Sequence, residues 1–190
     1  MISSVLVGLL ATTFGAPEVC DADEAFRTAL VAAIHRFAEE GELDHLRAIV
    51  EKYPELIDAK RTFRQPRKPV STDSFTPLYH AAERGRERVV TYLLEKRADV
   101  NIADGLGWTA LHLAAREGHL SVVKLLVKHG AKLDAKTVAI PEKFGFGPGA
   151  PDDAKPEKFP AVPARTALEL AEENKHVAVV QFLKMADNQF

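Results

Sequence analysis

Short apolar clusters recur along the chain with the spacing of amphipathic helices. The residues of Val122–Leu126 are apolar at four of five positions, which gives a helix one broad apolar face. A similar cluster lies at Val89–Leu94. Gly118 precedes the first cluster and Gly130 follows it, and glycine is the residue that most readily ends a helix in a left-handed conformation. The pattern therefore predicts short helices joined by tight turns.

The predicted helices belong to a sequence repeat. Thr76–Ala82 (TPLYHAA) aligns without gaps with Thr109–Ala115 (TALHLAA), and the two threonines are 33 residues apart. The alignment continues to Asn101 in the first copy and to Asp134 in the second. Two copies that match over their whole length indicate modules of one kind that stack on each other.

Two further copies are more degenerate. A downstream copy begins at Thr166–Ala171 (TALELA) and continues through His176. A fainter upstream copy contains Ile34 and His35, which align with Leu111 and His112. No single unit of this kind buries its apolar face alone, so the copies must stack for stability, and the terminal ones act as caps.

These residues resemble the ankyrin repeat, whose period is 33 residues and whose core is T-P-L-H-x-A. The resemblance covers Arg27 to about Met185. It implies an all-α ankyrin-repeat solenoid of about four stacked helix-turn-helix units with β-turn fingers and two insertions. We expect an ankyrin repeat domain at 21–190, with units near 27–59, 71–103, 104–137 and 161–190.

Local chemistry agrees with these boundaries. Thr109 is suited to cap a helix through its hydroxyl, and Pro77 stands at a first helical position, where its missing N–H costs nothing. Arg97 stands where the next unit has Gly130, so its turn should carry about 1 kcal/mol of strain. A helix over Asp23–Glu39 would cap the N-terminal end of the array.

The first insertion, at about 60–70, is basic. Its functional interpretation is a dock for an acidic partner or a phosphate. The structural alternative is a solvated loop stiffened by Pro66 and Pro69. No acidic residue occurs before Asp73, and the cations are Lys60, Arg61, Arg64, Arg67 and Lys68.

The second insertion, at about 138–163, is rich in proline and glycine. The tetrapeptide Pro-Glu-Lys-Phe occurs in it twice, at Pro141–Phe144 and Pro156–Phe159. Its prolines exclude a helix or a central strand. Phe144, Phe146 and Phe159 are large apolar residues, so they must either fold onto the array or meet a partner.

Residues 1–20 differ in composition from the rest. An apolar stretch at Val5–Leu10 precedes small residues and then acidic ones, which is the order of a secretory signal peptide. The pattern favours export, to a periplasm or the exterior, over a cytoplasmic location. The alternatives are an N-terminal helix that caps the domain and a disordered leader. The stretch is too short to span a bilayer.

Composition excludes several classes of protein. The formal net charge of −2 offers no global field for nucleic acid or anionic lipid. Cys20 is the only cysteine, so neither an intramolecular disulfide nor a cysteine-based zinc site can form.

Candidate chemistry is sparse. His112, His119 and His129 do not have the spacing of a helical zinc site, and the resemblance gives His112 a structural role through local hydrogen bonds. Gly145–Gly149 lacks the residues that complete a phosphate loop, and Asp152-Asp153 is more typical of a solvated loop. No nucleophile, base and orienting group can be assembled. We therefore expect no enzyme, no metal and no cofactor.

With no candidate catalytic site, the remaining candidate for function is a surface that binds a partner. In ankyrin proteins, partners contact the fingers and the inner face of the first helices. Phe75 and Trp108 hold equivalent finger positions and, as exposed aromatics near arginine, suit an interface; the alternative is that Trp108 only packs on a neighbouring finger. The resemblance points to these positions: Thr72, Asp73, Phe75, Glu83 and Arg84; Leu106, Trp108, Arg116 and Glu117; and Arg165, Glu173 and Asn174.

Two functions follow as expectations. The first is a monomeric, non-enzymatic module that binds a protein partner, of unknown identity, through the concave face and fingers of the array. The second is a regulator or inhibitor that acts on an enzyme through the proline-rich insertion.

Overall fold

The computed structural model describes residues 22–62, 74–139, 143–145, 157–159 and 161–187. The expected leader at 1–20 and Cys20 lie outside these residues. Within them, the α-helices form consecutive pairs: α2 (Ala22–Glu40) with α3 (Leu43–Lys52), α4 (Pro77–Glu83) with α5 (Glu87–Glu95), α6 (Ala110–Glu117) with α7 (Leu120–Lys128), and α8 (Ala167–Glu173) with α9 (Val177–Asp187). A 3-10 turn, η1 (Pro54–Leu56), follows α3, so Pro54 stands where the first unit ends its second helix.

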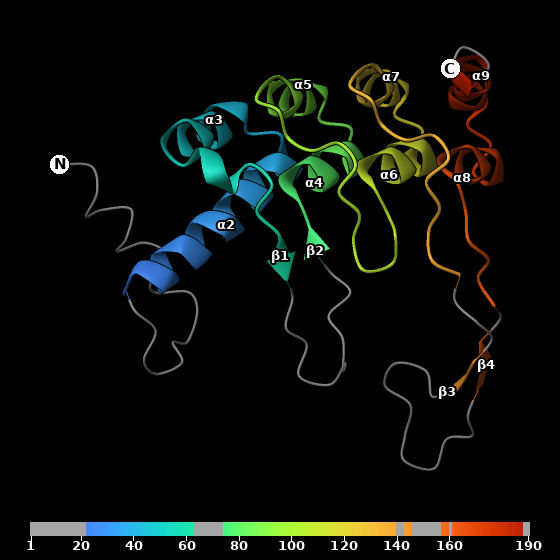
Figure 1. Ribbon diagram of the computed structural model, residues 1–190, viewed down its shortest axis with the longest axis horizontal. Helices are drawn as coiled ribbons and strands as arrows, with labels where there is room; N and C mark the ends of the chain where they lie inside the picture. Colours follow the sequence, from blue (N-terminus) through green and yellow to red (C-terminus); the bar gives the residue numbers. More distant parts are fainter. Residues whose placement is uncertain (1–21, 63–73, 140–142, 146–156, 160, 188–190) are drawn as a thin grey trace.

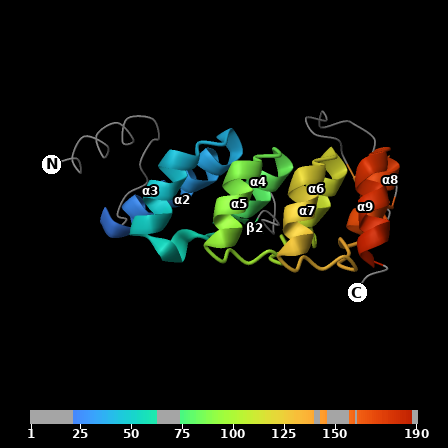
Figure 2. The ribbon, with the colours of Figure 1, turned by 90° about the horizontal axis from the view of Figure 1, so that it is seen from above.

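The helix pairs stack in two rows. The first helices α2, α4, α6 and α8 form an inner row, and the second helices form an outer row above it (Figure 1). From above, the pairs follow one another in a line (Figure 2). Small side chains let the inner helices approach closely, because Ala81, Ala82, Ala114 and Ala115 are all fully buried. The predicted all-α solenoid of stacked units is confirmed.

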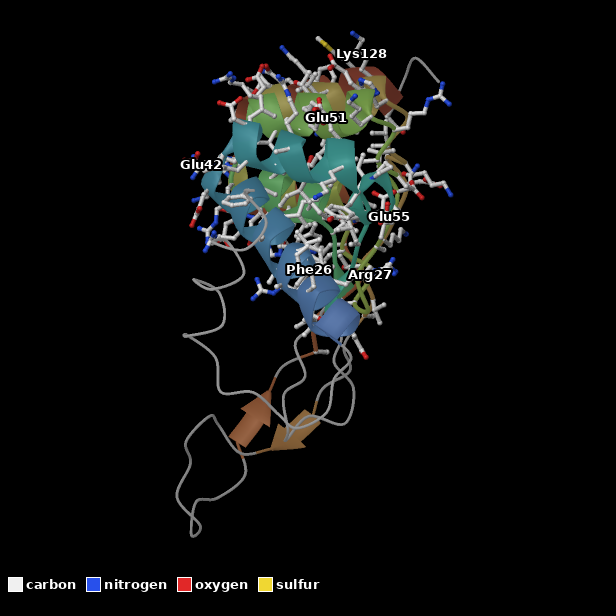
Figure 3. All side chains as sticks on the ribbon, turned by 90° about the vertical axis from the view of Figure 1, so that its left-hand side faces the viewer. Phe26, Arg27, Glu42, Glu51, Glu55 and Lys128 are labelled. Atoms are coloured by element: carbon white, nitrogen blue, oxygen red, sulfur yellow. The ribbon has the colours of Figure 1, made fainter. Side chains whose placement is uncertain are left out.

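The core runs the length of the array between the two rows. Charged side chains surround it, and in a view along the stack Glu42 and Glu55 lie on opposite sides of the molecule (Figure 3). The largest fully buried apolar side chains are Ile34, Leu46, Leu78, Val89, Val90, Leu93, Leu111, Leu113, Val122 and Leu126.

Threonine caps begin three of the inner helices. Thr76 Oγ1 accepts the Tyr79 N–H at 3.2 Å. Thr166 Oγ1 accepts the Glu169 N–H at 3.2 Å, and the Glu169 carboxylate accepts the Thr166 N–H at 2.8 Å. In α6 the acceptor of the Thr109 N–H is His112 Nδ1, at 3.2 Å. These bonds satisfy amides that a helix start leaves unpaired, as the sequence predicted for Thr109.

The turns between helices use the left-handed conformation. Gly118 has a φ of 81° and Gly130 a φ of 85°. Arg97 has a φ of 67°, which confirms the strained position predicted for it. Lys175, which the sequence analysis did not single out, has a φ of 62° at the position equivalent to Gly118.

One hydrogen bond recurs between neighbouring units. The residue after each left-handed turn reaches back to a carbonyl in the last turn of the preceding inner helix. This contact gives adjacent units a fixed relative position. The three bonds are Arg86 Nε to Glu39 O (2.9 Å), His119 Nε2 to Glu83 O (3.0 Å) and His176 Nε2 to Arg116 O (2.8 Å).

Two short antiparallel ribbons lie within the insertions. β1 (Arg61–Thr62) pairs with β2 (Ser74–Phe75), and β3 (Lys143–Gly145) pairs with β4 (Glu157–Phe159). In the second ribbon Lys143 lies opposite Phe159 and Phe144 opposite Lys158, so the Lys-Phe pairs that end the two Pro-Glu-Lys-Phe copies run antiparallel beside each other. β3 and β4 lie well away from the helices (Figure 1).

Candidate functional site

Three loops, here called fingers, begin and end at equivalent base residues, and their described parts lie on the same side of the inner row (Figure 1). Finger 1 runs from Arg61 to Phe75, which are paired in the β1–β2 ribbon. Finger 2 runs from Asp104 to Trp108, whose C=O accepts the Asp104 N–H at 3.0 Å. Finger 3 runs from Thr137 to Arg165, where the Arg165 C=O accepts the Thr137 N–H at 2.9 Å. Each insertion therefore lengthens a finger. It lies between two base residues that correspond to Asp104 and Trp108 of finger 2.

A side-chain oxygen closes two of these bases. Asp104 Oδ1 accepts the Leu106 and Trp108 N–H groups, both at 2.8 Å. Thr137 Oγ1 accepts the Arg165 N–H at 2.9 Å. Fingers 2 and 3 also touch through their backbones, since Val138 N–H donates to Leu106 O at 2.7 Å. The bases are therefore fixed, and Phe75, Trp108 and Arg165 take equivalent places directly before the helix caps.

The structure corrects the expectation that Phe75 and Trp108 are exposed, because both are half-buried. The Trp108 ring meets His112 edge-on at 6.1 Å, and Arg116 Cζ lies 5.2 Å from its centroid. The Phe75 ring lies 4.7 Å from the Tyr79 ring. Each aromatic packs on the inner helix of its own unit, where a cation or a polar ring covers part of its face.

The charged side chains predicted for the partner surface form ion pairs within the array. Glu39 and Arg84 join α2 to α4 at 2.6 Å. Arg116 joins α6 to α4 through Glu83 at 3.3 Å, and it also contacts Glu117 at 2.8 Å. Arg165 pairs with Glu173 in the last unit. This face of the array therefore presents matched charges beside half-buried aromatic rings.

The remaining predicted positions are less informative. Leu106 is half-buried at the tip of finger 2. The Asn174 amide donates to Leu170 O at 2.8 Å and so closes its own helix. Thr72 and Asp73 lie outside the described residues, as do Arg64, Arg67, Lys68 and Asp152-Asp153. Nothing is described of the side chains of Phe144, Phe146 and Phe159.

Buried histidines hold the chain that leads into the two long fingers. His35 Nε2 donates to Ala59 O at 2.8 Å, and His112 Nε2 donates to Ala135 O at 3.0 Å. Burial lowers the pKa of His35 to about 4 and also lowers the pKa of His112. The local hydrogen bonds expected of His112 are confirmed, while the role of His35 was indicated in the sequence only by its alignment with His112.

The described residues hold no group of three or more histidine, cysteine or acidic side chains that could bind a metal ion. None of the helices in the described part of the chain has the length and apolarity needed to cross a membrane.

Comparison with known proteins agrees with this architecture. A family model described as "Ankyrin repeats (3 copies)" matches residues 6–104 and 34–137, together more than half of the chain. Ankyrin repeat protein nuc-2 of Neurospora crassa is 31% identical over 100 residues, which are 53% of this chain and 8% of that protein. Human ankyrin repeat domain-containing protein 39 is 42% identical over 60 residues, which are 32% of this chain and 33% of that protein. The alignments thus cover a third or less of each relative's own length.

Proposed function

The chain belongs to the ankyrin repeat family, and from this premise we propose that it is a non-catalytic module that binds another protein through its inner helices and fingers. Ankyrin repeats in general mediate protein–protein interactions. The observation that carries the proposal is the alignment of Phe75, Trp108 and Arg165 at the bases of three neighbouring fingers, directly before the inner helices. The module is proposed to act as a monomer on a protein, not on nucleic acid.

The geometry supports a surface that is already ordered before binding. Arg116 is held by Trp108, Glu83 and Glu117 together, so its conformational entropy is largely lost in the free protein. A partner that contacts an ordered arginine beside an aromatic ring avoids most of that cost. Aromatic and arginine side chains also dominate the energetics of measured interfaces.

Affinity capture with matched variants tests this proposal. Trp108→Ala and Phe75→Ala should each lose a partner that the wild type retains, by tenfold or more in apparent affinity. Lys128→Ala, on the outer row, is the control and should retain it. Thermal unfolding must show that each variant is folded under the assay conditions. Equal recovery of every partner by all three variants would contradict the proposed surface.

A second candidate function is regulation of an enzyme by finger 3. What favours it is the regular pairing of this finger. Thr137 pairs with Arg165 and Lys143 with Phe159, and the number of residues from Thr137 to Lys143 equals the number from Phe159 to Arg165. The described strands of this finger, β3 and β4, lie away from the helices of the array (Figure 1).

Finger 2 supplies a short replacement for testing this alternative. Residues 138–164 would be exchanged for Gly-Leu-Gly, the sequence of 105–107, between the equivalent base residues. Inhibition of the target enzyme should then be lost while the array stays folded. If the shortened protein inhibits as well as the parent, finger 3 is not the inhibitory element.

A further inference from the structure

The histidines that hold the two long fingers differ in one respect. In a neutral imidazole whose Nε2 donates a hydrogen bond, Nδ1 carries no proton. His112 Nδ1 has partners in its own unit, because it accepts the Thr109 N–H at 3.2 Å and lies 2.8 Å from Thr109 Oγ1. His35 has Ala32 at the corresponding position, and among the described residues its buried Nδ1 has no hydrogen-bond partner. A second proton on His35 would therefore have no acceptor.

A second imidazole stands against His35. The His80 ring, from α4, meets it edge-on with the centroids 5.3 Å apart. His80 Nε2 is likewise buried without a partner in the described part of the chain, and its Nδ1 lies 4.0 Å from Glu83 Oε2. The His35 side chain is almost fully enclosed, with 1% of its residue surface exposed. Two adjacent imidazoles therefore occupy a site suited only to their neutral forms.

The same pair supports the base of finger 1. His35 bonds Ala59 O, just before β1, and the Phe75 ring of β2 lies 5.5 Å from the His80 ring. We propose that His35 and His80 form a proton-sensitive anchor for the base of finger 1, which acid releases.

The charges around the pair explain the direction of the effect. His35 faces His80 and Arg61, and both would repel a proton on it. His80 faces the carboxylates of Glu39 and Glu83 and the cations Arg61 and Arg84. Burial lowers the pKa of His80, and the two carboxylates only partly offset this, so a proton that His80 takes up as the pH falls stays in a buried site. Its charge then faces His35 and Arg61, the first residue of β1.

The sign follows from linkage. The pKa of His35 is lowered from 6.5 to about 4 by burial, against the hydrogen bond to Ala59, and further by His80 and Arg61. The open form, with an ordinary pKa, binds the proton more readily, so the closed form loses its advantage as the pH falls from 6.5 towards 4. Each proton involved raises the open population about tenfold per pH unit in that range.

Residue-resolved amide hydrogen exchange by NMR tests the anchor without any partner. Protection of the β1–β2 amides, divided by that of the α7 amides, should fall at least tenfold between pH 7 and pH 5. His35→Gln keeps a donor for Ala59 O but does not titrate, so this ratio should fall clearly less than in the wild type, because only His80 still titrates. His45→Gln, at an exposed position of α3, is the control and should behave as the wild type.

Two results would overturn the proposal. One is a wild-type ratio that stays constant between pH 7 and pH 5. The other is a His35→Gln variant whose ratio falls as the wild type's does. Should His35→Gln fail to fold, His80→Gln takes its place, and the His35 ring nitrogens in the wild type are titrated directly by NMR. A His35 that becomes charged above pH 6 with finger 1 still protected would also contradict the anchor.

Discussion

At the scale of single residues, the left-handed turns separate two reasons for a glycine. Gly118 and Gly130 have nearly the same φ, 81° and 85°. A Cβ at Gly118 would lie 2.5 Å from His176 Nδ1, whereas a Cβ at Gly130 would meet no heavy atom within 4 Å. Backbone strain therefore applies to both positions, but steric conflict only to the first.

This difference predicts unequal costs for one substitution. Gly130→Ala should lower the free energy of unfolding by about 1 kcal/mol, through strain alone. Gly118→Ala should cost roughly 2–4 kcal/mol, because His176 must also move and give up its bond to Arg116 O. Urea unfolding of both variants measures the difference. Equal costs would mean that the His176 contact contributes nothing to holding the last unit.

The carboxylate of Asp58 offers a case in which substitution should stabilise the protein. Both of its oxygens accept the Asp99 N–H at 3.2 Å. Burial raises its pKa, the hydrogen bond from Asp99 lowers it, and the charge of Asp99 raises it. In the equivalent turn of the next unit, Asn101 Oδ1 accepts the Lys132 N–H at 3.0 Å, and this acceptor carries no charge.

Asp58→Asn should therefore raise the free energy of unfolding at pH 7 by about 0.5 kcal/mol, the usual scale for partly exposed charges. A raised carboxyl pKa means that the wild type loses stability as the pH rises through the folded-state value. The gain should vanish below the ordinary pKa of 3.8. Urea unfolding at pH 7 and pH 3 checks it, and a loss of stability at both values would refute this account.

Helix caps and backbone strain were predicted well from the sequence, whereas contacts that form only in the folded chain were not. The Thr109 cap follows from neighbours in sequence and the strained Arg97 from its alignment with Gly130, so the sequence was sufficient for both. The bond from His176 to Arg116 O joins residues 60 positions apart, and nothing in their types indicates it. Phe75 and Trp108 were correctly placed at equivalent positions, but their burial depends on Tyr79 and Arg116, which cover them only after folding.

At the scale of elements, the fingers were located but not described by the sequence. Both insertions were placed between units, near 60–70 and 138–163. Their common base could not be predicted from residue types. The Thr137 hydroxyl accepts the N–H of Arg165, whereas the Asp104 carboxylate accepts the N–H of the equivalent residue, Trp108. Different residue types at equivalent positions conceal the equivalence until the hydrogen bonds are seen.

The Gly-Leu-Gly replacement of residues 138–164 also makes a prediction about stability. Closing a longer loop costs about 0.6 kcal/mol per doubling of its length, so this shortening should stabilise the array by roughly 1–2 kcal/mol if the ribbon makes no contact with it. Thermal unfolding measures the change. A marked loss of stability would instead show that Phe144, Phe146 or Phe159 folds onto the array, the alternative that the sequence left open.

At the scale of the whole molecule, the main contacts between the described helices of different units join neighbouring units: inner helix α2 packs on α4, α4 on α6, and α6 on α8. Stability in such an array is close to a sum of unit terms and interface terms. A substitution in a middle unit then weakens two interfaces, while one in the last unit weakens a single interface.

Two leucine truncations of the same size test this description. Leu111, in α6, has 1% of its surface exposed, and Leu183, in α9, has 3%, so each change to alanine should cost about 2–5 kcal/mol locally. Leu183→Ala should reduce hydrogen-exchange protection in α8 and α9 and leave α2 and α4 nearly unchanged. Leu111→Ala should reduce protection throughout, because units on both sides lose their support. If Leu183→Ala lowered protection in α2 as much as in α9, the four units would unfold only together and the sum of neighbour terms would not describe them.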